Sequence, residues 1–243
     1  MQIDNNQIYS QINIENDTLK ESYILGAELS GKYGFPQLKP VYVDFWGLKP
    51  VPFNKAKSEK NPRQSFVHFF VNDYEFERIW NNCDQHIDYL QNFKYVCSPD
   101  FSMYSDMPLA LQIYNTYRNR AVARYLWANG IDVIPTVGWS DESSFEWCFD
   151  GLPQNSTLAV STNGCFFPEG KECYQKGFEE MCRRLNPYNV IVIGSEIPVD
   201  VEVDTIYFKS HGQEMAERIS YGRKKWQKEN SDLSNGGGSI HDC

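Results

Sequence analysis

The sequence lacks any apolar run of the roughly 18 residues that a membrane-spanning helix needs, which excludes an integral membrane protein of the helical kind. Its first 17 residues are polar and acidic, unlike the basic and then apolar pattern of a secretion signal. We therefore expect a cytoplasmic protein that has no membrane partner.

Paired cysteines are also missing. The seven cysteines are an odd number and none forms a CxxC pair, so neither a disulfide framework nor a structural zinc site is expected. The four histidines are scattered without ligand spacing, and the sequence contains no GxxxxGK[ST], GxGxxG, HExxH or GxSxG motif. Cys165 follows Gly164 at a strand end, but no histidine is placed to act as its base.

Positive charge is in short supply, since 23 basic residues face 32 acidic ones and the formal net charge is −9. This balance argues against a general affinity for nucleic acid, whose phosphates attract Lys and Arg. A basic run near the carboxyl end is the exception, and it offers DNA a local contact through Arg223, Lys224, Lys225 and Lys228.

What the sequence does contain is a repeated alternation of short β-branched or aromatic runs with helical patterns. Strands are expected at Pro40–Asp44, Phe66–Val71, Lys94–Ser98, Ile131–Val137, Thr157–Ser161, Asn189–Ile193 and Thr205–Phe208. Helices are expected at Glu75–Asn92, Met107–Asn129, Ser143–Phe149 and Tyr174–Leu185. This order predicts an α/β fold with a parallel sheet, as a partial or complete β/α barrel of TIM-barrel-like type or as an open doubly wound sheet, and we favour the barrel.

Composition divides the chain into three parts. We expect an amino-terminal extension over residues 1–33, an α/β core domain over 34–210, and a basic tail with a flexible Gly/Ser end over 211–243. The proline- and lysine-containing segment Gly47–Ser65 is expected to form a surface loop or an ordered lid over the sheet.

Several strings carry a resemblance to a known family. They are Ser98-Pro99-Asp100-Phe101-Ser102, Asp106-Met107-Pro108, Gln112 to Arg120, Val133 to Trp139, Cys148 to Gly151 and Ser161 to Cys165. In these strings the chain resembles DUF4417, a bacterial and phage family of unknown function that is common on phages, prophages and plasmids. The resemblance implies a mobile genetic element in a bacterial host as the context, and it implies no chemistry.

The candidate site comes from position instead, because ligands of parallel α/β folds bind at the carboxyl ends of the strands. Candidate catalytic carboxylates that follow expected strands are Asp44, Asp100, Asp141 and Glu196. Such a group can split into an acid and a base, or hold a divalent metal ion as cofactor. Candidate ligand-binding residues at the same ends are Trp46, Asp73, Trp139, Thr162 and Asn163. The alternative is that each acid or amide only caps a helix or forms a turn.

A stripe of polar side chains on the long helix is the second signal. Gln112, Asn115 and Asn119 share one helix face, and Arg118 lies beside them, so that together they suit a phosphate or a nucleobase edge. The alternative is a buried hydrogen-bond network that ties the helix to the sheet.

Two functions of different classes follow. The first is a small-ligand-binding or enzymatic domain that acts on a phosphorylated or nucleotide-like molecule at the strand ends. The second is a non-enzymatic accessory protein that binds a host or phage protein, or DNA through its basic tail. The sequence does not decide whether the chain is an enzyme.

Overall fold

The structure is a computed structural model that describes residues 17–210, 212–217, 219–221, 223 and 226. Contacts divide the chain into a unit that ends at Phe208 and a second unit that begins at Lys209. In the second unit residues 212–217 are helical, and the Lys209 ammonium lies 2.7 Å from the Glu217 carboxylate. Most of the expected basic run and the whole Gly/Ser end lie outside the described residues.

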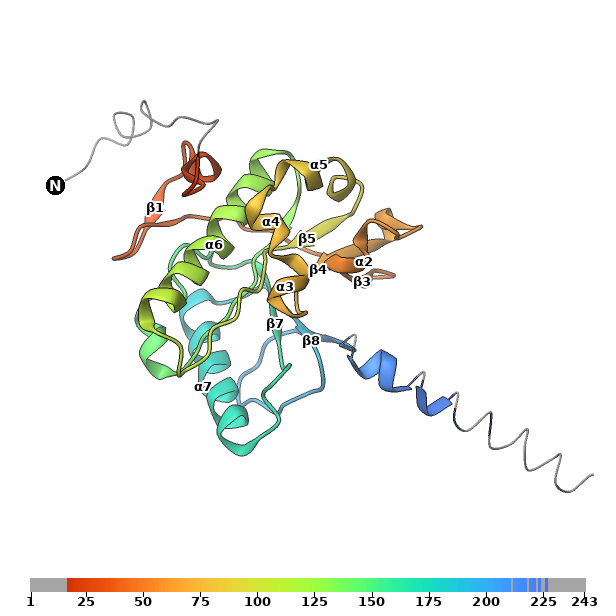
Figure 1. Ribbon diagram of the computed structural model, residues 1–243. Coiled ribbons are helices and arrows are strands. Elements are labelled where there is room, and N and C mark those ends of the chain that lie inside the picture. Colours follow the sequence, from red (N-terminus) through yellow and green to blue (C-terminus); the bar gives the residue numbers. More distant parts are fainter. Residues whose placement is uncertain (1–16, 211, 218, 222, 224–225, 227–243) are drawn as a thin grey trace, which may run out of the picture. The chain divides into compact units, whose positions relative to one another are not determined.

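Parallel strands form the centre of the first unit (Figure 1). One sheet has the order β3-β4-β5-β6, made of Lys49–Pro52, Ser65–His68, Tyr95–Cys97 and Val133–Ile134. The other has the order β7-β8-β9, made of Thr157–Ser161, Asn189–Ile193 and Thr205–Phe208. A single parallel bridge between Thr136 and Ala159 joins the end of β6 to β7. The α/β class and the parallel strands are thus confirmed.

Burial explains why these segments become strands. All five residues of β8 and all four of β4 are buried, as expected for parallel strands that helices cover on both faces. Their β-branched and aromatic side chains pack in a core that also contains the apolar residues of the helices.

Two long helices cross the sheets. Helix α6 spans Leu109–Ala128 and ends before Gly130, which has the positive φ expected of a residue after a helix. Helix α7 spans Pro168–Leu185 and ends at Asn186, a left-handed residue at φ 44°. Shorter elements are η3 (Glu21–Ile24), β1 (Leu29–Ser30), β2 (Phe35–Pro36), α2 (Phe53–Ala56), η4 (Pro62–Gln64) and η5 (Glu142–Glu146).

Three expectations about the strands need correction. The complete barrel is wrong, because the strands form two sheets and no closed sheet among the described residues. Residues 41–44 are no strand, because they run across the amino ends of β7 and β8, where Thr157 N–H donates to the Val41 carbonyl (2.7 Å). The segment expected to be a loop or lid, Gly47–Ser65, instead contains β3, which pairs in parallel with β4.

The helix expected over Glu75–Asn92 is divided into three short ones. They are α3 (Asp73–Phe76), α4 (Arg78–Asn81) and α5 (Asp84–Leu90). Asn82 interrupts the run with an extended backbone (φ −154°, ψ 89°). Each of the three short helices buries an apolar side chain in the core, namely Phe76, Ile79 and Ile87.

Candidate functional site

The carboxyl ends of β4 and β5 bring two carboxyl groups together. Asp73 begins α3 after β4, and Asp100 lies in the loop after β5. The Asp100 Oδ1 atom lies 3.6 Å from the place that a Cβ on Gly138 would occupy, so the loop after β6 approaches the same point. The carboxyl ends of three neighbouring strands therefore meet around Asp100.

Asp100 has an unusual electrostatic environment. Its side chain makes no hydrogen bond or ion pair with any residue that the structure describes. Water reaches it only in part, because the side chain is half-buried. Burial, and next the nearby charge of Asp73, raise the pKa of this carboxyl from 3.8 to about 7. A group with such a pKa can give or accept a proton near neutral pH.

Asp73 is fixed by the loop that follows Asp100. Its two carboxylate oxygens accept hydrogen bonds from the Ser102 backbone N–H (3.1 Å) and the Ser102 hydroxyl (2.7 Å). The Ser102 carbonyl in turn accepts a hydrogen bond from the Asn115 amide on α6 (2.6 Å). Asp73 thus anchors the loop that carries Asp100, and it also supplies charge beside it.

The amide stripe of α6 is used inside the protein. Gln112 donates to the Met107 carbonyl (2.8 Å) and accepts from the Ser140 hydroxyl (2.6 Å). Asn119 donates to the Pro99 carbonyl (2.6 Å), next to Asp100, and accepts from Arg120 (2.6 Å). The buried network expected as the alternative is therefore present, and it holds the strand-end loops against α6.

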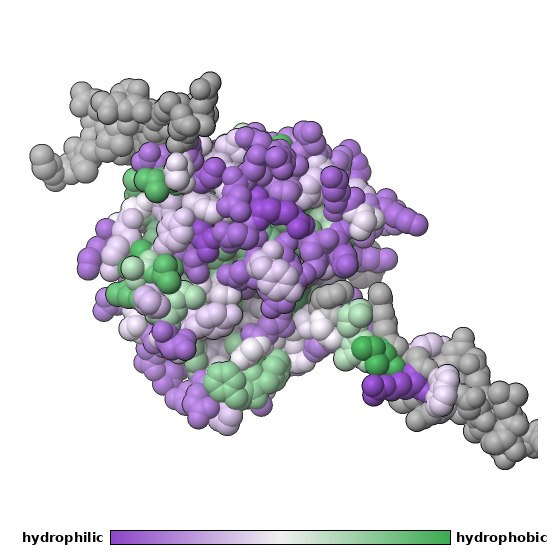
Figure 2. All heavy atoms as spheres, viewed as in Figure 1, coloured by the Kyte–Doolittle hydropathy of each residue, from purple (hydrophilic) through white to green (hydrophobic). Residues whose placement is uncertain are grey.

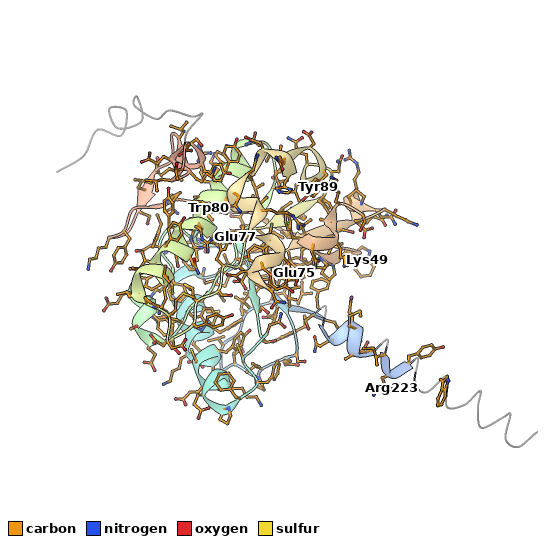
Figure 3. All side chains as sticks on the ribbon, in the orientation of Figure 1. Lys49, Glu75, Glu77, Trp80, Tyr89 and Arg223 are labelled. Atoms are coloured by element: carbon orange, nitrogen blue, oxygen red, sulfur yellow. The ribbon has the colours of Figure 1, made fainter. Side chains whose placement is uncertain are left out.

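The two arginines of this helix face have different partners. The Arg118 guanidinium pairs with the Glu77 carboxylate at 2.8 and 2.9 Å, and it lies 3.9 Å from the centroid of the Phe101 ring; Glu77 is labelled in Figure 3. Arg120 is fully buried and donates to the carbonyls of Cys148 (2.7 Å) and Asp150 (3.1 Å). Both arginines are therefore tied to protein groups, which weakens the interpretation of Arg118 as a phosphate ligand.

The carboxyl ends of β7 and β8 lie close to each other. The Thr162 hydroxyl, fully buried, donates to the Ser195 carbonyl (2.8 Å), and a Cβ on Gly194 would lie only 2.1 Å from it. Asn163 is exposed, and its amide donates to the Phe70 carbonyl just after β4 (3.4 Å). Thr162 thus has a packing role, whereas Asn163 lies at the edge of the site.

The remaining candidates at this end are spread out. The Asp141 carboxylate caps η5 by accepting from the Ser143 backbone N–H (2.9 Å), as the capping alternative expects. Trp139 is half-buried, and its indole donates to the Cys173 carbonyl on α7 (3.1 Å). Glu196 is exposed, and its charge adds to the burial that raises the pKa of Tyr207.

Asp44 and Trp46 lie at the opposite ends of the strands, which corrects their expected position. Both line a groove with Asn189 and Asp204, residues at or just before the first positions of β8 and β9. The Asp44 carboxylate accepts a hydrogen bond from the Trp46 backbone N–H (3.0 Å) and so forms a turn. The expected position was wrong because it assumed a strand that ends at Asp44, and residues 41–44 form no strand.

The structure adds Ser102 and Gly138 to the residues of the site. Ser102 belongs to the Pro99-Asp100-Phe101-Ser102 string, but only the contact with Asp73 reveals its part. Cys165 lies near enough for Asp100 to affect it, yet burial first of all raises the pKa of this thiol to about 11. At that pKa the thiol is a poor nucleophile at neutral pH.

The described part of the chain offers neither a metal cluster nor a membrane-spanning helix. No group of three or more His, Cys, Asp or Glu side chains there could hold a metal ion, so the four expected carboxylates form no metal cluster. Among the same residues, none of the helices has the length and apolar character required to cross a membrane.

Comparisons with known proteins give a family and two relatives. The family model described as "Domain of unknown function (DUF4417)" matches residues 27–211. The Gene 1 protein of Mycobacterium phage L5 is 33% identical over 173 residues, which cover 69% of this chain and 73% of the relative. The Gene 1 protein of Mycobacterium phage D29 is 30% identical over 173 residues, which cover 68% of this chain and 62% of the relative. No solved structure matches.

Proposed function

We propose, from the premise that this chain belongs to the DUF4417 family, that it binds a small polar ligand at the carboxyl ends of β4, β5 and β6 and exchanges a proton with it through Asp100. The observation that carries the proposal is the position of the Asp100 carboxyl. It lies at the strand ends where parallel α/β folds bind ligands, and it has no protein partner among the described residues.

The contrast with the neighbouring acids supports Asp100 as the reactive group. Asp73 is held by Ser102, and Asp141 caps η5, so each of these carboxylates already has a structural use. A half-buried carboxyl without a partner loses hydration that nothing replaces, and such a group is typical of functional sites. The pKa of about 7 would let Asp100 take a proton from a ligand hydroxyl or amine and return it.

The charge of the site bears on the class of ligand. With Asp73 beside Asp100, a phosphate placed directly against them would be repelled. Arg118, which suggested a phosphorylated ligand, is paired with Glu77. We therefore propose that a hydroxyl, amine or ring N–H of the ligand faces Asp100, as a nucleoside or a sugar would provide, and that any phosphate lies away from it.

A thermal-shift screen tests this proposal. The panel contains nucleosides, nucleotides, sugars, sugar phosphates and divalent ions, and a ligand of the folded state raises the unfolding midpoint with concentration. We expect a hydroxyl- or amine-bearing compound to raise the midpoint of the wild type and to lose most of this effect on Asp100→Asn.

Asp141→Asn is the matched control, since asparagine can also cap η5 and the residue is half-buried. It should keep the response of the wild type. An equal response of Asp100→Asn and the wild type would contradict the role of Asp100, and a flat screen would contradict these ligand classes.

A second function is favoured by exposed apolar side chains at the beginnings of the two long helices. Figure 2 shows apolar surface where α6 and α7 lie, and the exposed residues there are Leu109, Leu111, Tyr114, Phe166 and Phe167. Apolar surface of this kind supports an accessory protein that binds a host or phage protein. Capture of a partner that Leu111→Glu and Phe167→Glu abolish would favour it over the first proposal.

A further inference from the structure

The amino ends of β8 and β9 form a groove that the proposed strand-end site does not use. We call it the amino-end groove; it has a volume of 590 Å³ and its lining includes Tyr42, Asp44, Trp46, Tyr188, Asn189 and Asp204. That volume lies within the range of small-molecule sites in proteins, roughly 300–1,000 Å³. The groove is therefore large enough for a ligand side chain or a small molecule.

Its backbone is firmly held on one side. Val43 N–H donates to the Thr157 hydroxyl (3.0 Å), and the Asn189 amide donates to the Val43 carbonyl (3.3 Å). Asp44 then closes a turn on Trp46, and Gly47 continues with a φ of +72°, which suits glycine. The turn thus presents Trp46 outward on a fixed base.

Three aromatic rings of the groove face solvent. Trp46 is 92% exposed, and Tyr42 and Tyr188 are each 60% exposed. The two tyrosine rings meet edge to face, with their centroids 5.5 Å apart. Aromatic side chains usually bury most of their area, so these exposed rings offer faces on which a planar or cationic group can stack.

The charge of the groove has one sign. Among the residues that the structure describes, its lining contains the exposed carboxylates Asp44 and Asp204 and no basic side chain. Asp204 makes no side-chain hydrogen bond or ion pair with any residue that the structure describes. Carboxylates together with open aromatic faces favour a cation, and a planar guanidinium can both stack on an indole and donate two hydrogen bonds to a carboxylate.

We propose that the amino-end groove binds a guanidinium group, which stacks on Trp46 and pairs with Asp44 and Asp204. The site is independent of Asp100, which lies at the other ends of the strands. The ligand is recognised by its planar charge, whether it is a free arginine derivative or the arginine side chain of a peptide.

Titration with N-acetylargininamide and its neutral analogue N-acetylcitrullinamide tests this proposal. The shape is nearly the same, but citrulline carries a neutral urea group, in which an oxygen replaces one donating nitrogen of the guanidinium. Binding is followed through the NMR resonance of the Trp46 indole N–H, which Trp46→Phe identifies. We expect saturable binding of the arginine compound that is at least about fivefold tighter than that of the citrulline compound and weakens with added salt.

Three variants locate the binding. Asp44→Asn with Asp204→Asn and, separately, Trp46→Ala should each weaken the arginine compound by at least about fivefold. The Trp46→Ala substitution removes the indole whose resonance reports binding, so the affinity of this variant is measured by calorimetry. Asp88→Asn, an exposed acid on α5, should leave the affinity unchanged.

A second probe, the tripeptide acetyl-Ala-Arg-Ala-amide, distinguishes a free arginine derivative from the arginine side chain of a peptide. Tighter binding of the tripeptide than of N-acetylargininamide would assign the groove to peptides, and equal binding would assign it to free guanidinium compounds. Equal affinity for the arginine and citrulline compounds, or an unchanged affinity in the double variant with retained circular dichroism, would overturn the proposal.

Discussion

The Asp100 carboxyl lies in surroundings that oppose its charge, and this has a consequence for stability. Its pKa is 3.8 in an unfolded chain and about 7 in the fold, because of burial and then the charge of Asp73. Between about pH 4 and pH 7 the folded chain therefore binds more protons than the unfolded one. The contribution of this group to the free energy of unfolding falls as the pH rises through that window and stays low above it.

Asp100→Asn removes the charge and should therefore stabilise the protein at high pH. We expect a gain of ~2 kcal/mol in the free energy of unfolding at about pH 8, less than the full pKa shift implies because solvent reaches part of the side chain, and almost no gain near pH 4. Urea unfolding of both proteins across this range measures it. Asp88→Asn should change stability by less than ~0.5 kcal/mol, and a gain for Asp100→Asn that does not vary with pH would contradict the assignment.

The positions of single acidic residues show how much of the candidate site the sequence predicts. Asp100 and Asp73 were placed correctly at carboxyl ends, because each follows a strand that forms. Asp44 was not, because residues 41–44 have the β-branched pattern of a strand and yet bond to the amino ends of β7 and β8. A pattern of residues predicts extended backbone, but it does not show whether that backbone joins a sheet.

At the scale of elements, α6 shows why a helix face can be misjudged. Its buried residues include Gln112, Asn115, Asn119 and Arg120, whereas Tyr114 is 41% exposed. Sequence periodicity assigns apolar residues to the core, and here part of the core side of the helix is polar because the loop between β5 and α6 presents three of its carbonyl groups to it. Only the path of that loop reveals the partners.

The contact between α7 and the loop after β6 gives a prediction of its own. Gly177 lies directly under Trp139, where a Cβ would come within 2.1 Å of the indole ring, and the Trp139 N–H is fixed on the Cys173 carbonyl. Gly177→Ala should therefore lower the free energy of unfolding by ~2 kcal/mol, despite the better helix propensity of alanine.

Gly170 of the same helix is the matched control. Its Cβ would meet the exposed Phe167 ring at 2.9 Å, which can move aside, and the Cys165 backbone carbon at 3.2 Å, which needs only a small shift, so Gly170→Ala should lower the free energy of unfolding by less than ~1 kcal/mol. Chemical unfolding of the two variants compares them. Equal effects would show that the indole yields to the new methyl group.

For the whole molecule, the family and the division of contacts concern nearly the same stretch. The family match covers residues 27–211, and the first unit ends at Phe208, whose ring packs against Phe45 and Phe66 within that unit. Alternating strands and helices predicted the parallel α/β class. They left open whether the strands close into a barrel, because closure depends on pairing between the first and last strands, which local patterns do not encode.

Removal of the second unit should leave the first one folded. A chain that ends after Ser210 keeps Phe208 and every helix and strand of the first unit, so its thermal midpoint should lie within about 2 °C of that of the full chain. Circular dichroism during heating measures this, and a drop of more than about 5 °C would show that the first unit depends on residues beyond Ser210. If the fold is kept, the shortened chain also separates the functions: ligand binding at Asp100 should persist, and DNA retardation by the full chain, if it occurs, should be lost with the basic run.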